Sequence, residues 1–430
     1  MARALGLDFG TTNTVLALAE EAGATRSMRF TSSAGDTDTM RTALSFMKDP
    51  VVGAQALKVE AGQAAIRQFI DNPGDCRFLQ SIKTFAASAL FQGTLIFARR
   101  HGFDDLMEIF LRRLKAYAGE DWPGEVSRLV AGRPVQFAGA SPDPALAIER
   151  YNAALTRLGF PEIHYVYEPV AAAYYFAQTL KSDATVLVAD FGGGTTDYSL
   201  IRFERQAGRL TALPIGHSGV GIAGDHFDSR MIEHLVAPEI GKGTFFKSFD
   251  KLLEVPSGYY ANFARWNQLS IFKTTREFSD LKSLVRSALE PEKLELFIDL
   301  VEHDEGYPLY QAISATKMAL SADEEAEFRF APLGAAGNRT VRRADFERWI
   351  APELARIEGA LDEVLEKTGT APGAIDKVFL TGGTSFVPAV RSIFTRRFDA
   401  DRIESGGELL SIAHGLALIG ESEDVAQWAA

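Results

Sequence analysis

One element of the sequence occurs twice, nearly half a chain apart, and this internal repeat constrains the fold more than any other feature. The first copy is an apolar run that ends in Asp-Phe-Gly and a Gly/Thr turn, with its aspartate at Asp8. The second copy has the same order, with its aspartate at Asp190. Apolar residues flank both turns, so each copy predicts a strand, a tight turn and a second strand. A repeat of this length indicates two lobes of common design that face each other across a cleft, where small molecules usually bind.

Elsewhere, the spacing of apolar residues predicts an α/β chain. Strands are expected at 126–130, 163–167 and 377–380, and helices at 144–158, 170–180, 388–397 and 412–419. Thr384 or Ser385 is expected near the N-cap of the helix at 388–397. From 55 to about 114 the periodicity is helical, and residues 226 to about 310 are expected to form a helical subdomain, whose aromatic side chains we assign to its core.

Composition narrows the class of protein. A chain of 430 residues is too long for one simple core, so two or more domains or lobes are expected. The net charge of −12 argues against nucleic acid or an anionic membrane as the main partner. The single cysteine, Cys76, excludes an internal disulfide and a thiolate metal cage. The first residues leave no room for an apolar signal region, and no run of about 18 apolar residues occurs, so we expect a soluble, cytoplasmic protein.

Three Gly/Thr loops follow strands, at 10–13, 192–196 and 382–385. Glycine lets backbone amides approach phosphate oxygens, and hydroxyl groups add further donors. Asp8 and Asp190 stand directly before two of these loops. Since a carboxylate repels phosphate, these residues indicate an intervening divalent cation, and Mg²⁺ held through water suits them. The alternative is that each loop is an ordinary hairpin turn capped by aspartate. Three such loops, two of them repeats, favour phosphate binding.

Other nucleotide-binding motifs match poorly. No Gly-x-x-x-x-Gly-Lys-Ser/Thr loop occurs. The glycines at Gly219, Gly221 and Gly224 formally match a dinucleotide fingerprint, with Glu239 near the spacing of a ribose-binding acid. No βαβ unit is expected after them, so this alternative is weak.

Several segments, in order along the chain, resemble motifs of the heat-shock protein 70 (DnaK-type) chaperones. These segments are residues 6–14, 81–83, 167–172, 190–197, 223–231, 315–321 and 378–388. Together they span nearly the whole chain. Because the chain is short and has Gly132-Arg133-Pro134 where the family has Val-Pro-Ala, it is most similar to the short YegD-type members, which consist of the ATPase half alone.

The resemblance implies an actin-like ATPase fold, in which ribonuclease H-like duplicated lobes surround a central nucleotide cleft. Lobe I would comprise residues 1–180, with a helical subdomain at about 36–105. Lobe II would comprise residues 181–400, with a helical insertion at about 226–310. Residues 401–430 would form a C-terminal helix that returns to lobe I, and no peptide-binding domain is expected after it.

The resemblance also implies roles for individual residues. Lys83 would place its ammonium against the γ-phosphate and the attacking water, although its own surroundings would favour a solvated surface lysine. Glu168, Asp190, Asp197 and Thr195 complete the expected catalytic set. The expected phosphate-binding residues are Gly10, Thr11, Thr12, Asn13, Gly192, Gly193, Gly194 and Thr195. The expected adenosine-binding residues are Gly224, Lys317, Ser321, Gly382, Gly383, Thr384 and Phe386. Asp8 and Asp190 would hold Mg²⁺ through water, and K⁺ is a further candidate.

Three positions depart from the family pattern near the adenosine. Ser314 and Met318 stand where the family has glutamate and arginine, and Phe386 stands where it has arginine. The base would lose a polar clamp and gain apolar contacts, through which a purine can still stack.

We therefore expect an ATPase that binds ATP/ADP and Mg²⁺, hydrolyses ATP, and acts as a DnaK-type nucleotide-dependent conformational switch on an unknown protein partner or client. Neither nucleic acid nor a membrane is expected as a partner. The alternatives are a nucleotide-binding interaction module without hydrolysis, a sugar-type small-molecule kinase of the same superfamily, and a filament-forming actin relative.

Overall fold

The computed structural model describes residues 4–20, 23–49, 56–72, 74–124, 126–139, 141–206, 209–265, 269–273, 275–405, 410–422 and 425–428. The chain forms two compact units. The first unit comprises Met1–Gln68, Gln80–Gly224 and Leu354–Ala430, and the second unit comprises Phe69–Leu79 and Asp225–Glu353. These units follow the packing of the chain, whereas the lobe boundaries expected from the sequence follow its repeat. The lobe boundaries stay a prediction.

The first sheet of the first unit contains the first copy of the repeat. Its strands are β1 (Ala4–Phe9), β2 (Asn13–Ala19), β3 (Thr25–Ser27), β12 (Arg128–Arg133) and β13 (Ile163–Tyr167), in the order β13-β12-β1-β2-β3, and β6 (Met40–Arg41) pairs with β2. β1 pairs antiparallel with β2 and parallel with β12. The antiparallel register places Asp8 opposite Val15 and leaves the turn at residues 10–12.

The second sheet, in the same unit, contains the second copy and has the same topology. Its strands are β14 (Ala184–Phe191), β15 (Thr196–Gln206), β16 (Arg209–Val220), β21 (Lys377–Thr381) and β22 (Ile403–Ser405), in the order β22-β21-β14-β15-β16. As in the first sheet, the strand with the aspartate pairs antiparallel with the next strand and parallel with a later one. The shared order confirms the internal repeat. The register places Asp190 opposite Asp197, so the second copy has an aspartate where the first copy has Val15.

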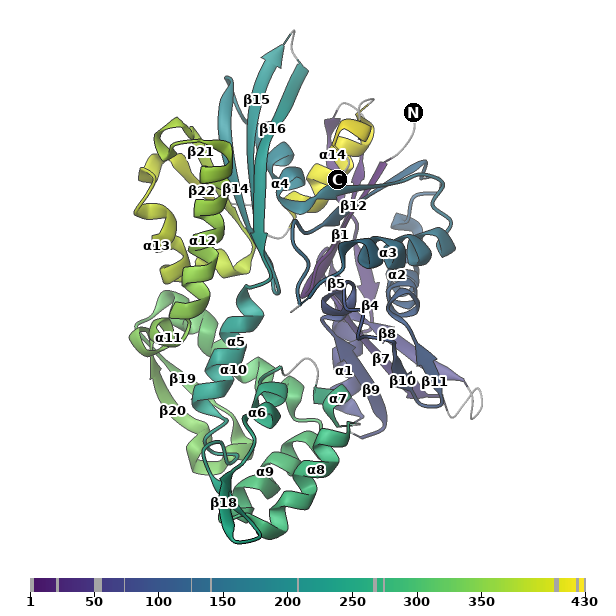
Figure 1. The fold of residues 1–430 in the computed structure, drawn as a ribbon. Coiled ribbons are helices and arrows are strands. Elements are labelled where there is room, and N and C mark those ends of the chain that lie inside the picture. Colours follow the sequence, from purple (N-terminus) through teal and green to yellow (C-terminus); the bar gives the residue numbers. More distant parts are fainter. Residues whose placement is uncertain are drawn as a thin grey trace. The chain divides into compact units, whose positions relative to one another are not determined.

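Two helices pack between the sheets (Figure 1). α4 (Glu168–Ala177) packs on β14 and β15, and α14 (Ser411–Glu421) packs on β1, β2 and β12. Where the helices cross, a Cβ at Gly415 would overlap the carbonyl group of Ala171. Small residues allow this close approach, and a shared apolar core joins both helices to both sheets, including Val130, Ala171, Val186 and Leu416.

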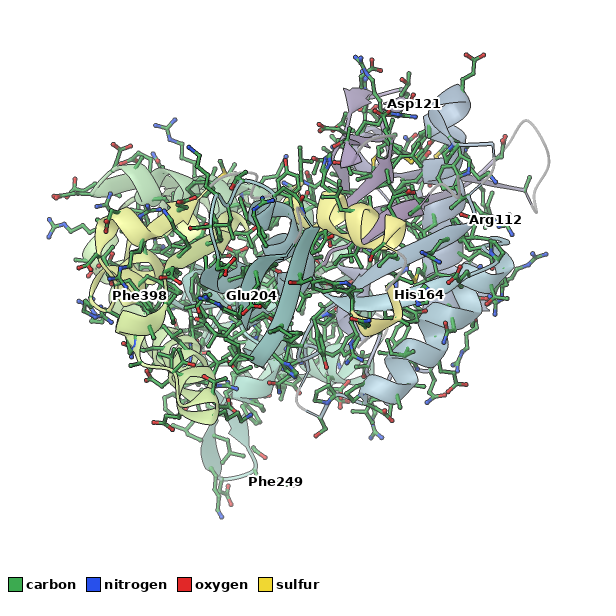
Figure 2. The ribbon with its side chains drawn as sticks, turned by 90° about the horizontal axis from the view of Figure 1, so that it is seen from above. Arg112, Asp121, His164, Glu204, Phe249 and Phe398 are labelled. Carbon is green, nitrogen blue, oxygen red and sulfur yellow. The ribbon has the colours of Figure 1, made fainter. Side chains whose placement is uncertain are left out.

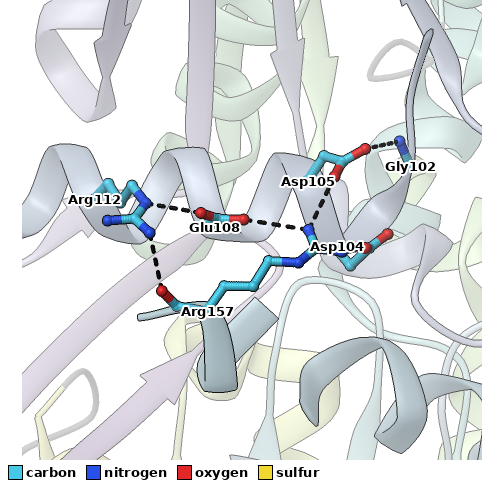
Figure 3. Close-up of polar contacts among 6 residues, drawn as sticks. All are labelled: Gly102, Asp104, Asp105, Glu108, Arg112 and Arg157. Carbon is cyan, nitrogen blue, oxygen red and sulfur yellow. Dashed lines mark hydrogen bonds and ion pairs between the residues drawn. The ribbon is translucent and has the colours of Figure 1, made fainter. Parts of the chain in front are cut away.

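α2 (Phe103–Ala118) and α3 (Pro144–Arg157) pack on each other in the first unit. Figure 3 shows how Arg157, at the end of α3, joins the carboxylates of the first turns of α2. Its guanidinium contacts Asp104 (2.5 Å), Asp105 (3.0 Å) and Glu108 (3.2 Å), and Arg112 donates to the Arg157 carbonyl oxygen (2.9 Å). Several charge-assisted bonds on one side chain hold the two helices in one register.

The helical pattern expected from 55 to about 114 is wrong for much of its length, because among the residues described there only α1 (Gly62–Asp71), η2 (Ile82–Phe85) and α2 are helical. Short strands, turns and irregular segments make up the rest of the described part. The strands between 30 and 101 are β4 (Phe30–Ser32), β5 (Gly35–Thr37), β6, β7 (Ala43–Lys48), β8 (Leu57–Ala61), β9 (Cys76–Gln80), β10 (Thr94–Ile96) and β11 (Arg99–His101). Helical periodicity misled here because a short apolar run contains too few residues to distinguish a strand from a helix.

The second unit is mainly helical. Its helices are α5 (Gly224–Leu235), α6 (Ser257–Ala264), α7 (Leu269–Phe272), α8 (Arg276–Leu284), α9 (Pro291–Glu302), α10 (Gly306–Ala322) and α11 (Arg343–Trp349), and α12 (Ala351–Thr368) continues into the first unit, which also contains α13 (Pro388–Thr395). The hairpins are β17 (Phe245–Ser248) with β18 (Lys251–Glu254), and β19 (Glu325–Arg329) with β20 (Asn338–Arg342).

The aromatic residues of the second unit mostly form its core, as expected. The rings of Tyr260, Phe263 and Phe272 surround the Phe297 ring, with centroids 5.0–6.3 Å away. Phe249 is an exception, because it lies at the tip of the β17–β18 hairpin and points away from it (Figure 2).

Candidate functional site

The turn between β1 and β2 is held by its own glycine and by Thr42. A Cβ at Gly10 would overlap the Asn13 carbonyl oxygen, so the tight turn requires glycine there. The buried Thr42 hydroxyl donates to the Gly10 carbonyl oxygen (2.8 Å), and the Thr42 amide donates to the Thr12 carbonyl oxygen (2.9 Å). Thr11 is buried, and Thr12 and Asn13 are half-buried.

The turn between β14 and β15 lies beside the first turn. The Gly192 amide donates to the Thr195 carbonyl oxygen (2.9 Å), which closes the turn over Gly193 and Gly194. A Cβ at Gly194 would lie 3.4 Å from Thr11 Oγ1. The two Gly/Thr turns of the repeat therefore meet within the first unit, with Asp8 and Asp190 at the ends of the strands that lead into them.

The loop after β21 joins the second turn. Gly382 has a φ of +82°, and a Cβ there would overlap the Phe191 carbonyl oxygen, so glycine is required on both counts. Thr384 Oγ1 donates to the Gly192 carbonyl oxygen (3.3 Å). Thr384 and Ser385 lie near the N-cap of α13, as expected, but neither caps the helix: the N-cap is Val387, and the Ser385 hydroxyl donates to the Gly382 carbonyl oxygen (2.7 Å). These residues instead shape the loop.

Lys83 is a buried lysine and not a surface lysine. It lies in η2 with 8% of its surface exposed, and its Nζ atom is 2.6 Å from Glu168 Oε1. Glu168 is the first residue of α4 and is buried as well. A Cβ at Gly132 lies only 3.0 Å from Glu168 Cγ, so a larger residue on β12 would crowd this carboxylate. A backbone hydrogen bond connects the segment that carries Lys83 to Thr42, because the Ser81 amide donates to the Thr42 carbonyl oxygen (3.2 Å). Thr42 in turn holds the first Gly/Thr turn.

Asp197 is fully buried, and two backbone amides fix its carboxylate. Its Oδ1 atom accepts from the amides of Val135 (2.8 Å) and Gln136 (3.1 Å). Its Oδ2 atom has no hydrogen-bond partner among the described residues. One carboxylate oxygen is therefore fixed by the chain, and the other remains a buried acceptor.

Negative charge exceeds positive charge at this site. Burial, and then the charge of Glu168, raise the pKa of Asp8 to about 7, against the lowering effect of Lys83. Burial and the neighbouring carboxylates raise the pKa of Asp190 well above its ordinary value. Burial lowers the pKa of Lys83, but the charge of Glu168 raises it by more than burial lowers it. The pKa therefore lies above its ordinary value, and the ammonium persists at neutral pH. A cation would stabilise the ionised carboxylates.

Asp197 provides a test of these electrostatics through stability. Burial and then the charge of Glu168 raise its pKa from 3.8 to about 7. The Gln136 amide, Thr195 and Lys83 lower the pKa, but by less. The folded chain thus holds this proton more tightly than the unfolded chain, and the residue lowers stability as pH rises from about 4 to about 7. Asp197→Asn stays neutral and keeps an oxygen for the two amides. We expect it to unfold at a higher temperature than wild type at pH 8, with no difference below about pH 4.

Thermal unfolding followed by circular dichroism across pH 4–8, without nucleotide, measures this difference. Asp401→Asn is the matched control, because Asp401 is exposed and its substitution should leave the unfolding temperature unchanged throughout. Equal unfolding temperatures for Asp197→Asn and wild type at pH 8 would contradict the prediction.

Comparison with known proteins identifies the family. The model of the family described as Hsp70 protein matches residues 110–244 and 284–421, which is more than half of the chain. The chain belongs to the Hsp70 family. Hsp70 proteins have the actin-like ATPase fold, and the match supports a nucleotide-binding, chaperone-type ATPase domain. The expected α/β fold with duplicated lobes is thereby confirmed.

One relative of this Hsp70 chain is the chaperone protein DnaK of Thermus thermophilus. The two are 25% identical over 452 residues, an alignment that covers 99% of this chain and 62% of DnaK. The chain thus spans about three fifths of the length of that relative. The YegD-type subtype stays a prediction. Among the described residues, no helix is both long and apolar enough to cross a lipid bilayer.

The expected adenosine-binding residues of this Hsp70 chain are divided between the two units. Gly224, Gly382, Gly383, Thr384 and Phe386 belong to the first unit, in which the Phe386 side chain is 53% exposed. Lys317 and Ser321 belong to the second unit. There the Lys317 ammonium lies 2.5 Å from the buried carboxylate of Asp228, and the Ser321 hydroxyl donates to the Lys317 carbonyl oxygen (3.1 Å). Met318, the next residue on α10, is exposed.

The dinucleotide alternative is wrong for this chain. Gly219 lies inside β16, opposite Asp197, and not in a turn before a helix. A Cβ at Gly219 would collide with Asp197 Oδ1, so this glycine makes room for the aspartate.

Sequence reasoning missed Thr42, Gly132 and the amides of Val135 and Gln136. Thr42 follows a two-residue strand, and the amides act through backbone atoms, so residue type carries no signal for either. Gly132 was noted only as a departure from the family pattern. His226 and His234 lie on α5, where the His234 ring stacks on Trp349.

Proposed function

We propose that this chain binds ATP with Mg²⁺ and hydrolyses it, and that the nucleotide state sets its conformation for a protein partner or client. The observation that carries the proposal is that the two Gly/Thr turns meet in the same unit that contains the buried Lys83–Glu168 pair. Phosphate oxygens fit turns whose backbone amides are accessible beside glycine. A fixed ammonium suits the charge that develops when a phosphoryl group is transferred to water.

The residues of the site suit the following roles. The turns at Gly10–Asn13 and Gly192–Thr195 bind phosphate oxygens through amides and hydroxyl groups. Lys83 stabilises negative charge on the transferred group, Glu168 orients Lys83, and Asp197 and Thr195 position the attacking water. Thr384 and Phe386, with Gly224, Gly382 and Gly383, contact the adenosine. The roles of Lys317 and Ser321, which belong to the second unit, stay a prediction from the family resemblance. Met318 and Phe386 offer apolar surface where the family has arginine.

Mg²⁺ fits the carboxylates of this site. Asp8 and Asp190 lie near the ends of β1 and β14, the strands that lead into the two turns, and their raised pKa values reflect unbalanced negative charge. Among the described residues, no group of three His, Cys, Asp or Glu side chains is arranged to bind a metal directly. Asp8 and Asp190 would therefore hold Mg²⁺ through water, which is common for this ion. Bound Mg²⁺ would neutralise charge on the phosphate oxygens. K⁺ beside the same carboxylates is a further proposal.

Single-turnover ATP hydrolysis, with nucleotide binding measured separately by calorimetry, tests the proposed function. We expect wild type to hydrolyse ATP with Mg²⁺, to lose this activity in EDTA, and to regain it when Mg²⁺ is restored in excess. The physical reason is that uncompensated carboxylates repel the nucleotide phosphates. Hydrolysis that persists in EDTA would contradict the role of the metal. Binding without any turnover would favour the non-hydrolysing interaction module, whereas the family assignment does not favour the kinase or filament alternatives.

A further inference from the structure

Tyr151 is a buried residue of α3 to which the proposed function assigns no role. Its ring stacks on Phe103 with 5.6 Å between centroids, and the rings of Phe9 and Phe137 meet it edge-on at 6.0 and 6.3 Å. Phe9 directly follows Asp8 in β1. The aromatic cluster therefore packs against the strand that leads into the first turn.

The hydroxyl group of Tyr151 differs from those of two other tyrosines of the first unit, Tyr165 and Tyr198. Tyr165 donates to Asn152 Oδ1 (2.8 Å), and Tyr198 donates to the Ile357 carbonyl oxygen (3.2 Å). The Tyr151 Oη atom is buried and has no hydrogen-bond partner among the described residues. A buried hydroxyl without a partner lowers stability. Each such group requires a physical explanation, such as a bound water or a functional role.

The charges that act on Tyr151 are those of the proposed site. Burial raises its pKa most, the Lys83 ammonium lowers it, and the carboxylates of Glu168 and Asp8 raise it. The resulting pKa lies well above the ordinary value for tyrosine, so the phenol keeps its proton at neutral pH. The hydroxyl is thus a hydrogen-bond donor within the field of the Lys83–Glu168 pair.

α3 is tied directly to the segment that carries Lys83. Arg150, the residue before Tyr151, donates through Nη1 to the carbonyl oxygens of Phe85 (2.9 Å), Ala86 (2.9 Å) and Ser88 (3.1 Å). These carbonyl groups end or directly follow η2, which contains Lys83. At the other end of α3, Arg157 fixes the helix to α2 (Figure 3). Tyr151 is therefore held in one position relative to Lys83.

We propose that Tyr151 is a positioning residue of the ATPase site, whose phenolic hydroxyl donates a hydrogen bond, through an ordered water, to the Glu168 carboxylate of the Lys83–Glu168 pair. This inference rests on the proposed function. A donor fixed by aromatic packing holds the pair in the orientation that hydrolysis requires, without a reorganisation cost at the moment of reaction. Nucleotide binding depends on the two turns and not on this hydroxyl. Its loss should therefore affect the rate of hydrolysis more than the affinity.

Tyr151→Phe tests the inference, with Tyr260→Phe as a matched control. Tyr260 lies in the second unit and is 2% exposed, and its Oη atom likewise has no partner among the described residues. We expect Tyr151→Phe to slow single-turnover ATP hydrolysis about tenfold or more, with the Kd for ATP unchanged within about threefold. Its unfolding temperature should equal or exceed that of wild type, because a buried hydroxyl without a partner is removed. Tyr260→Phe should change neither rate nor Kd.

The outcomes separate this inference from the proposed function. A wild-type rate in Tyr151→Phe would overturn the inference alone. A lower unfolding temperature, with rate and affinity lost together, would show that the hydroxyl has a structural role and would also overturn it. Absence of hydrolysis in wild type would overturn both the inference and the proposed function.

Discussion

Lys83→Ala is expected to slow single-turnover ATP hydrolysis about a hundredfold to a thousandfold while the Kd for ATP changes by less than about threefold. The ammonium is buried and held 2.6 Å from Glu168 Oε1, so its direction is fixed before nucleotide binds. A charge fixed in advance stabilises the transition state more than the bound ground state. Rapid-quench measurement of phosphate release, beside calorimetry for binding, separates the two effects.

This substitution also leaves Glu168 buried without its partner, which costs about 3–5 kcal/mol of stability. The double variant Lys83→Met/Glu168→Gln controls for that cost, because it replaces the ion pair by two neutral side chains of similar size. It should recover most of the stability but none of the hydrolysis. Lys367→Ala, which removes an exposed lysine paired with Glu363, should change neither property. If Lys83→Ala hydrolyses ATP at the wild-type rate, its proposed role is wrong.

Gly415→Ala is expected to lower the free energy of unfolding by about 3 kcal/mol. A Cβ at this position would overlap the Ala171 carbonyl group, and backbone atoms on both sides cannot rotate away. α14 and α4 must therefore separate, which opens the core that both helices share with the two sheets. Because α4 begins at Glu168, the same shift should also slow ATP hydrolysis.

Gly359→Ala is the matched control for this prediction. Gly359 lies in α12, is exposed, and has no atom within 4 Å of the position that a Cβ would occupy. Alanine there should raise stability by about 0.5–1 kcal/mol, because glycine is a poor helix former. Urea denaturation of both variants measures the change in the free energy of unfolding, which should be negative for Gly415→Ala and positive for Gly359→Ala. A Gly415→Ala variant as stable as wild type would show that the helices do not cross so closely.

The sequence could predict the repeat and its local geometry well. Each copy is a hairpin with a turn of about three to five residues, and such a turn depends on glycine and on apolar residues within about ten positions. The register that places Asp190 opposite Asp197 follows from the same short spacing. The remaining motifs were interpreted through their resemblance to the Hsp70 family, and the match to the family model confirms that the chain belongs to this family.

Long-range packing could not be predicted from residue types. The short strands β8 to β11, between 57 and 101, were assigned to a helical pattern, since periodicity over so few residues does not distinguish a strand from a helix. Thr384 and Ser385 have the residue type of an N-cap, yet Val387 takes that position because the loop turns back on Gly192. Residue type cannot distinguish these cases, because tertiary contacts outweigh local preference.

The sequence by itself determined the two hairpins, their glycine turns and the aspartates that precede the turns. Residues close together in the chain specify each of these features. Tertiary structure decided which distant groups complete the site. It buried Lys83 against Glu168, 85 residues away, and gave Asp197 the amides of Val135 and Gln136, about 60 residues away. A lysine is ordinarily exposed, and only a folded core with a carboxylate in reach makes its burial stable.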